Sequence, residues 1–146
     1  RALQHNHIPF DPDLLVKGDF RSASGYNAMQ KLLELPLPPT AVFACNDMMA
    51  LGAIHAVYER GLKIPGGMSV IGFDNIPISQ TVYPPLTTIE QPIHQMAELG
   101  VTLLLDRIKI HGQRNWTDDE QPVCKRIVLE TKLIERNSCR EVVGKF

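Results

Sequence analysis

Three residues at the ends of predicted strands could together bind a small polar molecule. Phe20 can stack on the apolar face of a ring, Asn46 can donate and accept hydrogen bonds at once, and Asp74 can accept two hydroxyl protons. This combination suits a polyol or a heterocycle. Each residue also has a plainer explanation, with Phe20 in the core, Asn46 as a helix N-cap and Asp74 as a turn residue. Residue type alone leaves both interpretations open.

The surrounding pattern predicts alternating strands and helices. Continuous apolar runs over 41–45 and 67–73 are typical of strands covered on both faces, and 13–20 predicts a shorter strand that ends at Asp19–Phe20. Helices are expected over three ranges, the first with Ser22 as its N-cap: 22–35, 47–61 and 93–112. We expect a last strand over 125–136, after a polar loop at 115–122, and a weakly ordered tail over 137–145.

This order predicts an α/β fold, a parallel sheet with right-handed crossovers and helices on both faces. The carboxyl ends of parallel strands lie along one edge of the sheet, where such folds bind ligands. Phe20, Asn46 and Asp74 each follow a predicted strand, so we expect them to lie close together at that edge. Three such residues at three equivalent strand ends favour a binding site over coincidence.

Composition and motifs exclude several other functions. The net charge is -1, from 15 basic and 16 acidic residues among 146, so the chain shows no basic excess for nucleic acid. Three widely spaced cysteines (Cys45, Cys124 and Cys139) favour neither a disulfide framework nor a zinc site. The five histidines lack the spacing of a metal site, and no nucleophile elbow, phosphate loop or H-E-x-x-H motif is present. We therefore expect no catalytic residue, metal or cofactor.

Longer stretches resemble a known family. The strings "GDFRSASGYNAMQKLL", "PTAVFACNDMMALGAIHAVYERGLKIPGGMSVIGFDN" and "YPPLTTIEQP" are similar to the effector-binding core of the LacI/GalR family of bacterial transcriptional repressors. The resemblance runs from about Ala2 to Ile134. It implies a periplasmic-binding-protein-like fold of type I, in which Phe20, Asn46 and Asp74 contact the effector.

The resemblance also implies a domain plan and partners. Residues 1–88 would form the C-terminal lobe, and 89–146 a segment that crosses back toward an N-terminal lobe not present in this sequence. The helix over 47–61 and the loop near "YPPL" would form a homodimer interface, for which we expect four residues: Met48, Leu51, Ile54 and Tyr83. A sugar, nucleoside or purine would be the effector. Operator DNA would be bound only through a helix-turn-helix headpiece upstream of Arg1, so we expect the chain to be a piece of a longer protein.

Two alternatives remain at this stage. A periplasmic sugar-binding protein has a similar fold, although the apolar helix over 47–61 favours a subunit interface over a monomeric carrier. An α/β enzyme is the weaker alternative, because no catalytic motif supports it. Without a signal peptide or an apolar run of about 18 residues, we expect a cytoplasmic protein that does not span a membrane.

Overall fold

The chain divides into two compact units. The computed structural model describes residues 2–113 and 126–141. The first unit combines Arg1–Glu90 with Leu133–Phe146, and the second is Gln91–Lys132. The sequence predicted one division after residue 88, with everything beyond it in a second segment. The compact units differ from this plan in that the chain returns to the first unit at Leu133, and the plan of two lobes stays a prediction.

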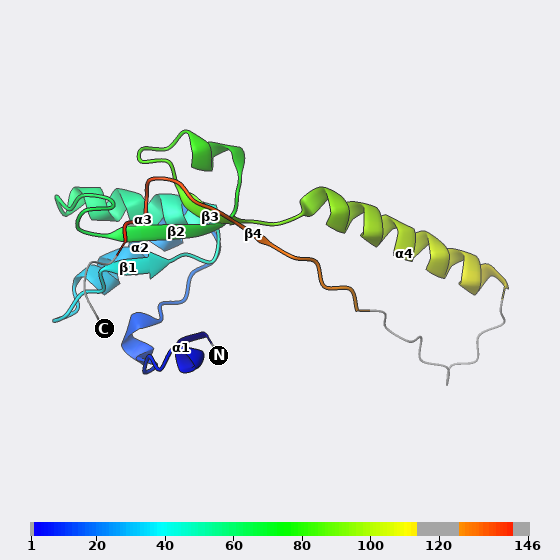
Figure 1. Cartoon of the computed structure of the whole chain (residues 1–146), viewed down its shortest axis with the longest axis horizontal. Coiled ribbons are helices and arrows are strands. Elements are labelled where there is room, and N and C mark those ends of the chain that lie inside the picture. Colours follow the sequence, from blue (N-terminus) through cyan, green and yellow to red (C-terminus); the bar gives the residue numbers. More distant parts are fainter. Residues whose placement is uncertain (1, 114–125, 142–146) are drawn as a thin grey trace. The chain divides into compact units, whose positions relative to one another are not determined.

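A four-stranded sheet forms the centre of the first unit (Figure 1). Its strands lie in the order β1 (Ala41–Phe43), β2 (Ser69–Asp74), β3 (Thr87–Glu90) and β4 (Lys132–Ile134). β1 and β2 pair in parallel with Phe43 opposite Ile71, and β2 and β3 pair in parallel with Asp74 opposite Glu90. The expected α/β fold with parallel strands is thereby confirmed.

Two helices pack against each other beside this sheet, α2 (Ser22–Leu33) and α3 (Asp47–Glu59) (Figure 1). Their close approach depends on two glycines. A Cβ on Gly25 would collide with the backbone of Met49, and one on Gly52 would collide with the backbone of Ser22. The N-cap of α2 is Arg21, which makes no side-chain capping bond, so the expected cap at Ser22 is wrong.

The core lies between these helices and the sheet. Val70 of β2 and Ala50, Ala56 and Val57 of α3 are completely buried. At the outer edge, the Tyr26 hydroxyl donates to Glu59 Oε2 at 2.5 Å and so links α2 to α3. α3 is apolar around most of its circumference because it packs on both α2 and the sheet.

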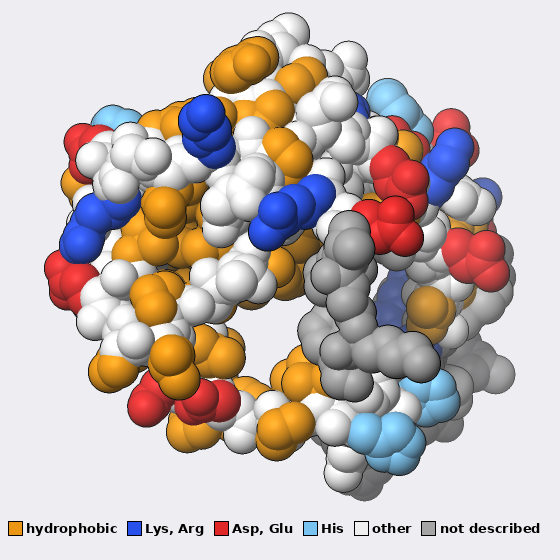
Figure 2. All heavy atoms as spheres, turned by 60° about the vertical axis from the view of Figure 1, so that its left-hand side comes forward, with side chains coloured by type: hydrophobic (Ala, Val, Ile, Leu, Met, Phe, Trp, Pro, Cys, Tyr) orange, Lys and Arg blue, Asp and Glu red, His pale blue; other side chains and the backbone are white. Residues whose placement is uncertain are grey.

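The other face of β1 is open. Phe43 is 56% exposed, so the cover expected on both faces is not seen at this strand among the described residues. Figure 2 shows apolar side chains interspersed with charged ones over the face turned forward there. Large exposed apolar areas on a protein mark surfaces that bind other chains.

The strand expected over 13–20 is wrong. Pro12–Leu14 form a short 3-10 helix, with Asp11 as its N-cap, and no strand is assigned over 15–20. Apolar residues in an extended segment become a strand only when a neighbouring strand supplies hydrogen bonds. Phe20 therefore follows an extended segment without ladder partners rather than a strand.

Residues 137–141 are held by the sheet, contrary to the weak order expected there, and the rest of the tail expected over 137–145 lies outside the described residues. Ser138 is completely buried, and its hydroxyl accepts from Thr87 N–H at 2.8 Å and donates to the Val70 carbonyl at 2.5 Å. The Ser138 carbonyl accepts from Val70 N–H at 2.9 Å. This segment satisfies backbone groups of β2 and β3 for which no other partner is seen in the described chain.

The second unit contains α4 (Ile93–Gln113) and the returning segment 126–131. The sequence predicted a strand over 125–136, but residues 126–131 do not form one. The final strand is thus limited to Lys132–Ile134. None of the described helices is long and apolar enough to cross a membrane. Cys124 and the polar loop expected at 115–122 lie outside the described residues.

Candidate functional site

Two of the predicted site residues, Asn46 and Asp74, follow β1 and β2 at matching positions along the sheet. Phe43 and Ile71 are register partners, and Asn46 and Asp74 each lie three residues further along the chain. The third residue joins them through its backbone, because Asn46 Nδ2 donates to the Phe20 carbonyl at 2.9 Å. The structure therefore gathers Phe20, Asn46 and Asp74 at the carboxyl edge of the parallel strands.

The backbone at this edge is strained. Phe20, Asp74 and Asn75 have φ angles of 66°, 115° and 56°, in the left-handed region where side chains other than glycine are uncommon. Such conformations cost about 1–3 kcal/mol each and persist where surrounding contacts impose them. Phe20 is 64% exposed, so its ring is available to stack on a ligand.

Asn46 serves the fold and the site at the same time. Its Oδ1 accepts from Met49 N–H at 2.8 Å, which makes it the N-cap of α3, while its Nδ2 holds Phe20. The plainer reading as an N-cap is thus correct. One amide hydrogen and one lone pair of Oδ1 remain for a ligand.

The turn before Phe20 is fixed by a small polar cluster. Asp19 N–H donates to Ser24 Oγ at 3.0 Å, Ser24 Oγ donates to the Arg21 carbonyl at 2.8 Å, and Asp19 Oδ1 accepts from Arg21 N–H at 3.0 Å. The Ser24 hydroxyl, followed by the Arg21 backbone N–H, lowers the pKa of the Asp19 carboxyl below its ordinary 3.8. Because these bonds favour its ionised form, Asp19 remains a hydrogen-bond acceptor in mildly acidic solution.

A buried carboxylate supports the turn that carries Asp74. Asp47 is completely buried, its Oδ2 accepts from Ile76 N–H at 2.9 Å, and its Oδ1 accepts from the Thr88 hydroxyl at 2.5 Å. Sequence reasoning missed this role, because an acid in the first turn of a helix is already explained by the helix dipole. The signal that could have found it is Gly72, since a Cβ there would collide with Asp47 Oδ1.

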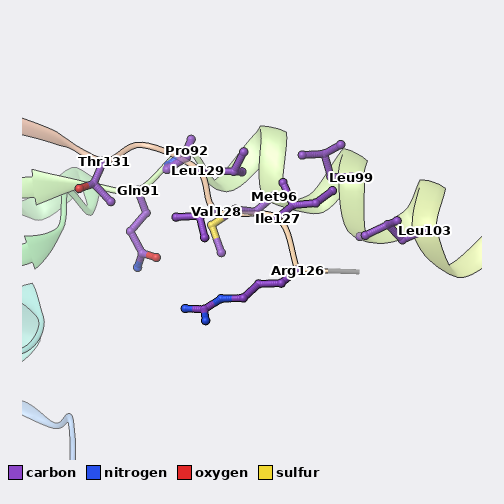
Figure 3. Close-up of a pocket in the computed structure, with 11 residues that line it drawn as sticks. Gln91, Pro92, Met96, Leu99, Leu103, Arg126, Ile127, Val128, Leu129 and Thr131 are labelled. Carbon is purple, nitrogen blue, oxygen red and sulfur yellow. The ribbon is translucent and has the colours of Figure 1, made fainter. Parts of the chain in front are cut away.

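A large groove lies elsewhere, within the second unit. It has a volume of about 570 Å³ and is lined by α4 and the returning segment. Figure 3 shows Met96 and Leu103 on α4, and Val128 and Leu129 on the returning segment. None of the three predicted effector contacts lines it, and its apolar walls suit another protein surface better than a polar ligand.

Comparison with known proteins identifies the family. The sequence profile of the periplasmic binding protein-like domain matches residues 1–139. The probable HTH-type transcriptional repressor ExuR of Bacillus subtilis is 39% identical over 141 residues, which cover 97% of this chain and 40% of ExuR. The chain belongs to the LacI/GalR family.

Solved structures agree with this assignment. The transcriptional regulator CelR in complex with cellobiose superposes with a TM-score of 0.82 at 35% identity, over 94% of this chain and 39% of CelR. A LacI family regulator of Enterococcus faecium with bound ribose gives a TM-score of 0.76 at 34% identity, over 94% of this chain and 47% of that one. The chain spans about two fifths of the length of the curated relatives it matches.

Membership in the LacI/GalR family bears on both alternatives. The relatives are named as transcriptional repressors rather than as periplasmic carriers or enzymes, which favours a regulator. Among the described residues, no three His, Cys, Asp or Glu side chains gather as a metal site would require.

The four residues expected at a LacI-type dimer interface differ in accessibility. Met48 is 41% exposed, Leu51 is half-buried and Tyr83 is 83% exposed. Ile54 is only 4% exposed and belongs to the core, so it offers no surface to a partner. The Tyr58 hydroxyl donates to the Tyr83 carbonyl at 3.2 Å and connects α3 to the loop that presents Tyr83.

Proposed function

We propose that this chain is part of the ligand-sensing core of a LacI-type transcriptional regulator. A sugar or similar small polar effector binds at the edge formed by Phe20, Asn46 and Asp74. The longer protein binds operator DNA through a helix-turn-helix headpiece and acts in the bacterial cytoplasm, where that DNA lies.

The single observation that carries this proposal is the strained, cross-linked edge itself. Left-handed backbone at Phe20 and Asp74, together with the bond from Asn46 to the Phe20 carbonyl, supports a site whose groups are held in place before any ligand arrives. A site that is already ordered loses little conformational entropy on binding. Because relatives bind cellobiose and ribose, a sugar is the first candidate effector.

Each side chain has a chemical role toward a sugar. The Asp74 carboxylate accepts hydrogen bonds from two ligand hydroxyls, and Asn46 contributes its remaining amide hydrogen. The Phe20 ring packs against the apolar C–H face of the sugar or a base. Effector binding then shifts the population of two arrangements of the regulator, which changes how its headpieces fit DNA.

The test is calorimetry on the full-length regulator with cellobiose, ribose and nucleosides. Asp74→Ala should weaken binding of the active ligand by roughly 2–4 kcal/mol, the cost of lost charged hydrogen bonds at a half-buried edge. Asp13→Ala removes an exposed carboxylate from the same unit and is the matched control. A loss of tenfold or less in Asp74→Ala would reduce Asp74 to a turn residue.

We also propose that Met48, Leu51 and Tyr83 form a homodimer interface. Tyr83 is the strongest candidate because exposed tyrosines often carry much of the binding energy at interfaces. In the full-length regulator, Tyr83→Ser should raise the dimer dissociation constant at least tenfold in sedimentation equilibrium. An unchanged dissociation constant would remove this surface from the proposal.

A further inference from the structure

Both connections between the two units start from one small region of the first unit. The chain leaves the first unit after Glu90, at the end of β3, and returns to it at Leu133. Asp74, the proposed effector acid, lies opposite Glu90 in the sheet. Whatever fixes Glu90 and the residues just after Leu133 therefore controls where both connections begin.

The side chain of Asn75 bridges these two places. Its Nδ2 donates to Glu90 Oε1 at 2.7 Å, and its Oδ1 accepts from Arg136 Nη2 at 2.6 Å. One amide thus contacts the last residue before the outgoing connection and a residue three positions beyond the incoming one. Both bonds involve a charged partner, which makes them stronger than bonds between neutral groups.

Arg136 is anchored on its other side. Its Nη1 donates to the Leu86 carbonyl at 2.6 Å and to Ser79 Oγ at 3.2 Å, and its backbone N–H donates to Thr87 Oγ1 at 3.0 Å. The guanidinium therefore ties the returning chain to the start of β3 and to the loop after Asn75. Planar arginine is suited to such multiple fixed bonds.

Asn75 lies between two residues that are each held by the fold. Asp74 is the last residue of β2 and pairs with Glu90 in the sheet. Ile76, the next residue, is held by the buried Asp47 carboxylate, and Asn75 N–H itself donates weakly to Thr88 Oγ1 at 3.4 Å. A displacement of the Asp74 backbone by a ligand would reach Asn75 first, whose φ is 56°, and would move the amide that contacts Glu90 and Arg136.

We propose that Asn75 is a positioning residue that couples occupancy of Asp74 to both connections between the units. This inference rests on the proposed function, because it takes Asp74 as the effector acid. It assigns to one amide the transmission of ligand binding to the two chain segments that connect the units. Arg136 and Glu90 are its partners.

The variant that removes only the side-chain bridge is Asn75→Gly. Glycine adopts a positive φ without steric cost, so this change removes the bridge and keeps the backbone conformation. Asn75→Asp is the second variant, because a carboxylate can still accept from Arg136 and can no longer donate to Glu90. Asn27→Ala, an exposed asparagine on α2, is the matched control.

The experiment is hydrogen exchange with mass spectrometry on the full-length regulator, with and without the sugar (cellobiose or ribose) that gives heat in calorimetry. Without ligand, Asn75→Gly should speed exchange in peptides covering 87–91 and 133–138 by about tenfold, the loss expected for charged hydrogen bonds. Asn75→Asp should affect 87–91 more than 133–138. Exchange at both peptides equal to that of Asn27→Ala would overturn the bridge.

The ligand arm tests the coupling. In the wild-type protein, ligand should change exchange in both peptides. In Asn75→Gly that change should disappear while the ligand dissociation constant stays within about threefold, because Asn75 is not one of the residues proposed to contact the ligand. A full ligand response in Asn75→Gly overturns the proposal, and so does a loss of affinity as large as that of Asp74→Ala. Absence of heat with every ligand in the wild-type protein would instead refute the proposed function, and the exchange result without ligand would still stand.

Discussion

Replacing Asp47 tests whether a buried carboxylate holds the proposed site in shape. Its two oxygens accept from Ile76 N–H and from the Thr88 hydroxyl, and the side chain is completely buried. Asp47→Ala leaves the buried Thr88 hydroxyl and the partly buried Ile76 N–H without this partner, at about 1–3 kcal/mol each. The free energy of unfolding should therefore fall by about 2–6 kcal/mol, a large part of the stability of a domain.

Asp47→Asn separates hydrogen bonding from charge. The asparagine oxygen can accept from Ile76 N–H, and its amide can donate to Thr88 Oγ1 once that hydroxyl turns. This variant should lose only about 1 kcal/mol, the worth of one rearranged bond. Asp13→Ala, an exposed carboxylate, should change the free energy of unfolding by less than about 0.5 kcal/mol.

Urea unfolding followed by circular dichroism measures these differences, at a concentration where light scattering shows a single species. With a slope of about 2 kcal/mol per M, the middle of the usual range for urea, Asp47→Ala should lower the midpoint by about 1–3 M. A midpoint within about 0.3 M of the wild type, below what the slope converts to a lost hydrogen bond, would refute the structural role. An Asp47→Asn variant as unstable as Asp47→Ala would show that charge, not hydrogen bonding, is needed.

Three other predictions follow from the same structure. Gly72→Ala should destabilise the chain by about 1–3 kcal/mol in urea, because the new methyl group would collide with Asp47; a neutral result would place Asp47 elsewhere. Desolvation, with a smaller contribution from Tyr83, raises the pKa of Tyr58 above 10.0, so its contribution to stability is complete below pH 10.0 and is lost as the pH rises through the folded pKa. Spectrophotometric titration should find the pKa of Tyr58 lower in Tyr83→Phe, and an unchanged pKa would exclude this influence. Because α4 carries many exposed apolar side chains, the isolated chain should self-associate in light scattering, and a monomer of 16.3 kDa would contradict this.

The sequence by itself determined the family, the alternation of elements and the edge where the site lies. Apolar runs and helical periodicity are local properties, so the segments that became α2, α3 and β2 were predicted within a few residues. The placement of Asn46 and Asp74 at one edge also followed, because parallel strands direct their carboxyl ends the same way, whereas Phe20 reaches that edge without a strand and is bonded there through its carbonyl to Asn46. Asn46 showed that a local role as an N-cap and a site role can coexist in one side chain.

Only the tertiary structure decided which residues far apart in the sequence form hydrogen bonds with each other. The segment 15–20 contains strand-forming residues but has no ladder partner in the described chain. Ser138, in a polar stretch, is buried because it bonds to backbone groups of Thr87 and Val70. Asn75 bonds to Arg136, which lies 61 residues further along the chain. The residues adjacent to a polar side chain in the sequence do not indicate which distant backbone group it will bond to. The partner is determined only when the sheet and its connections fold together.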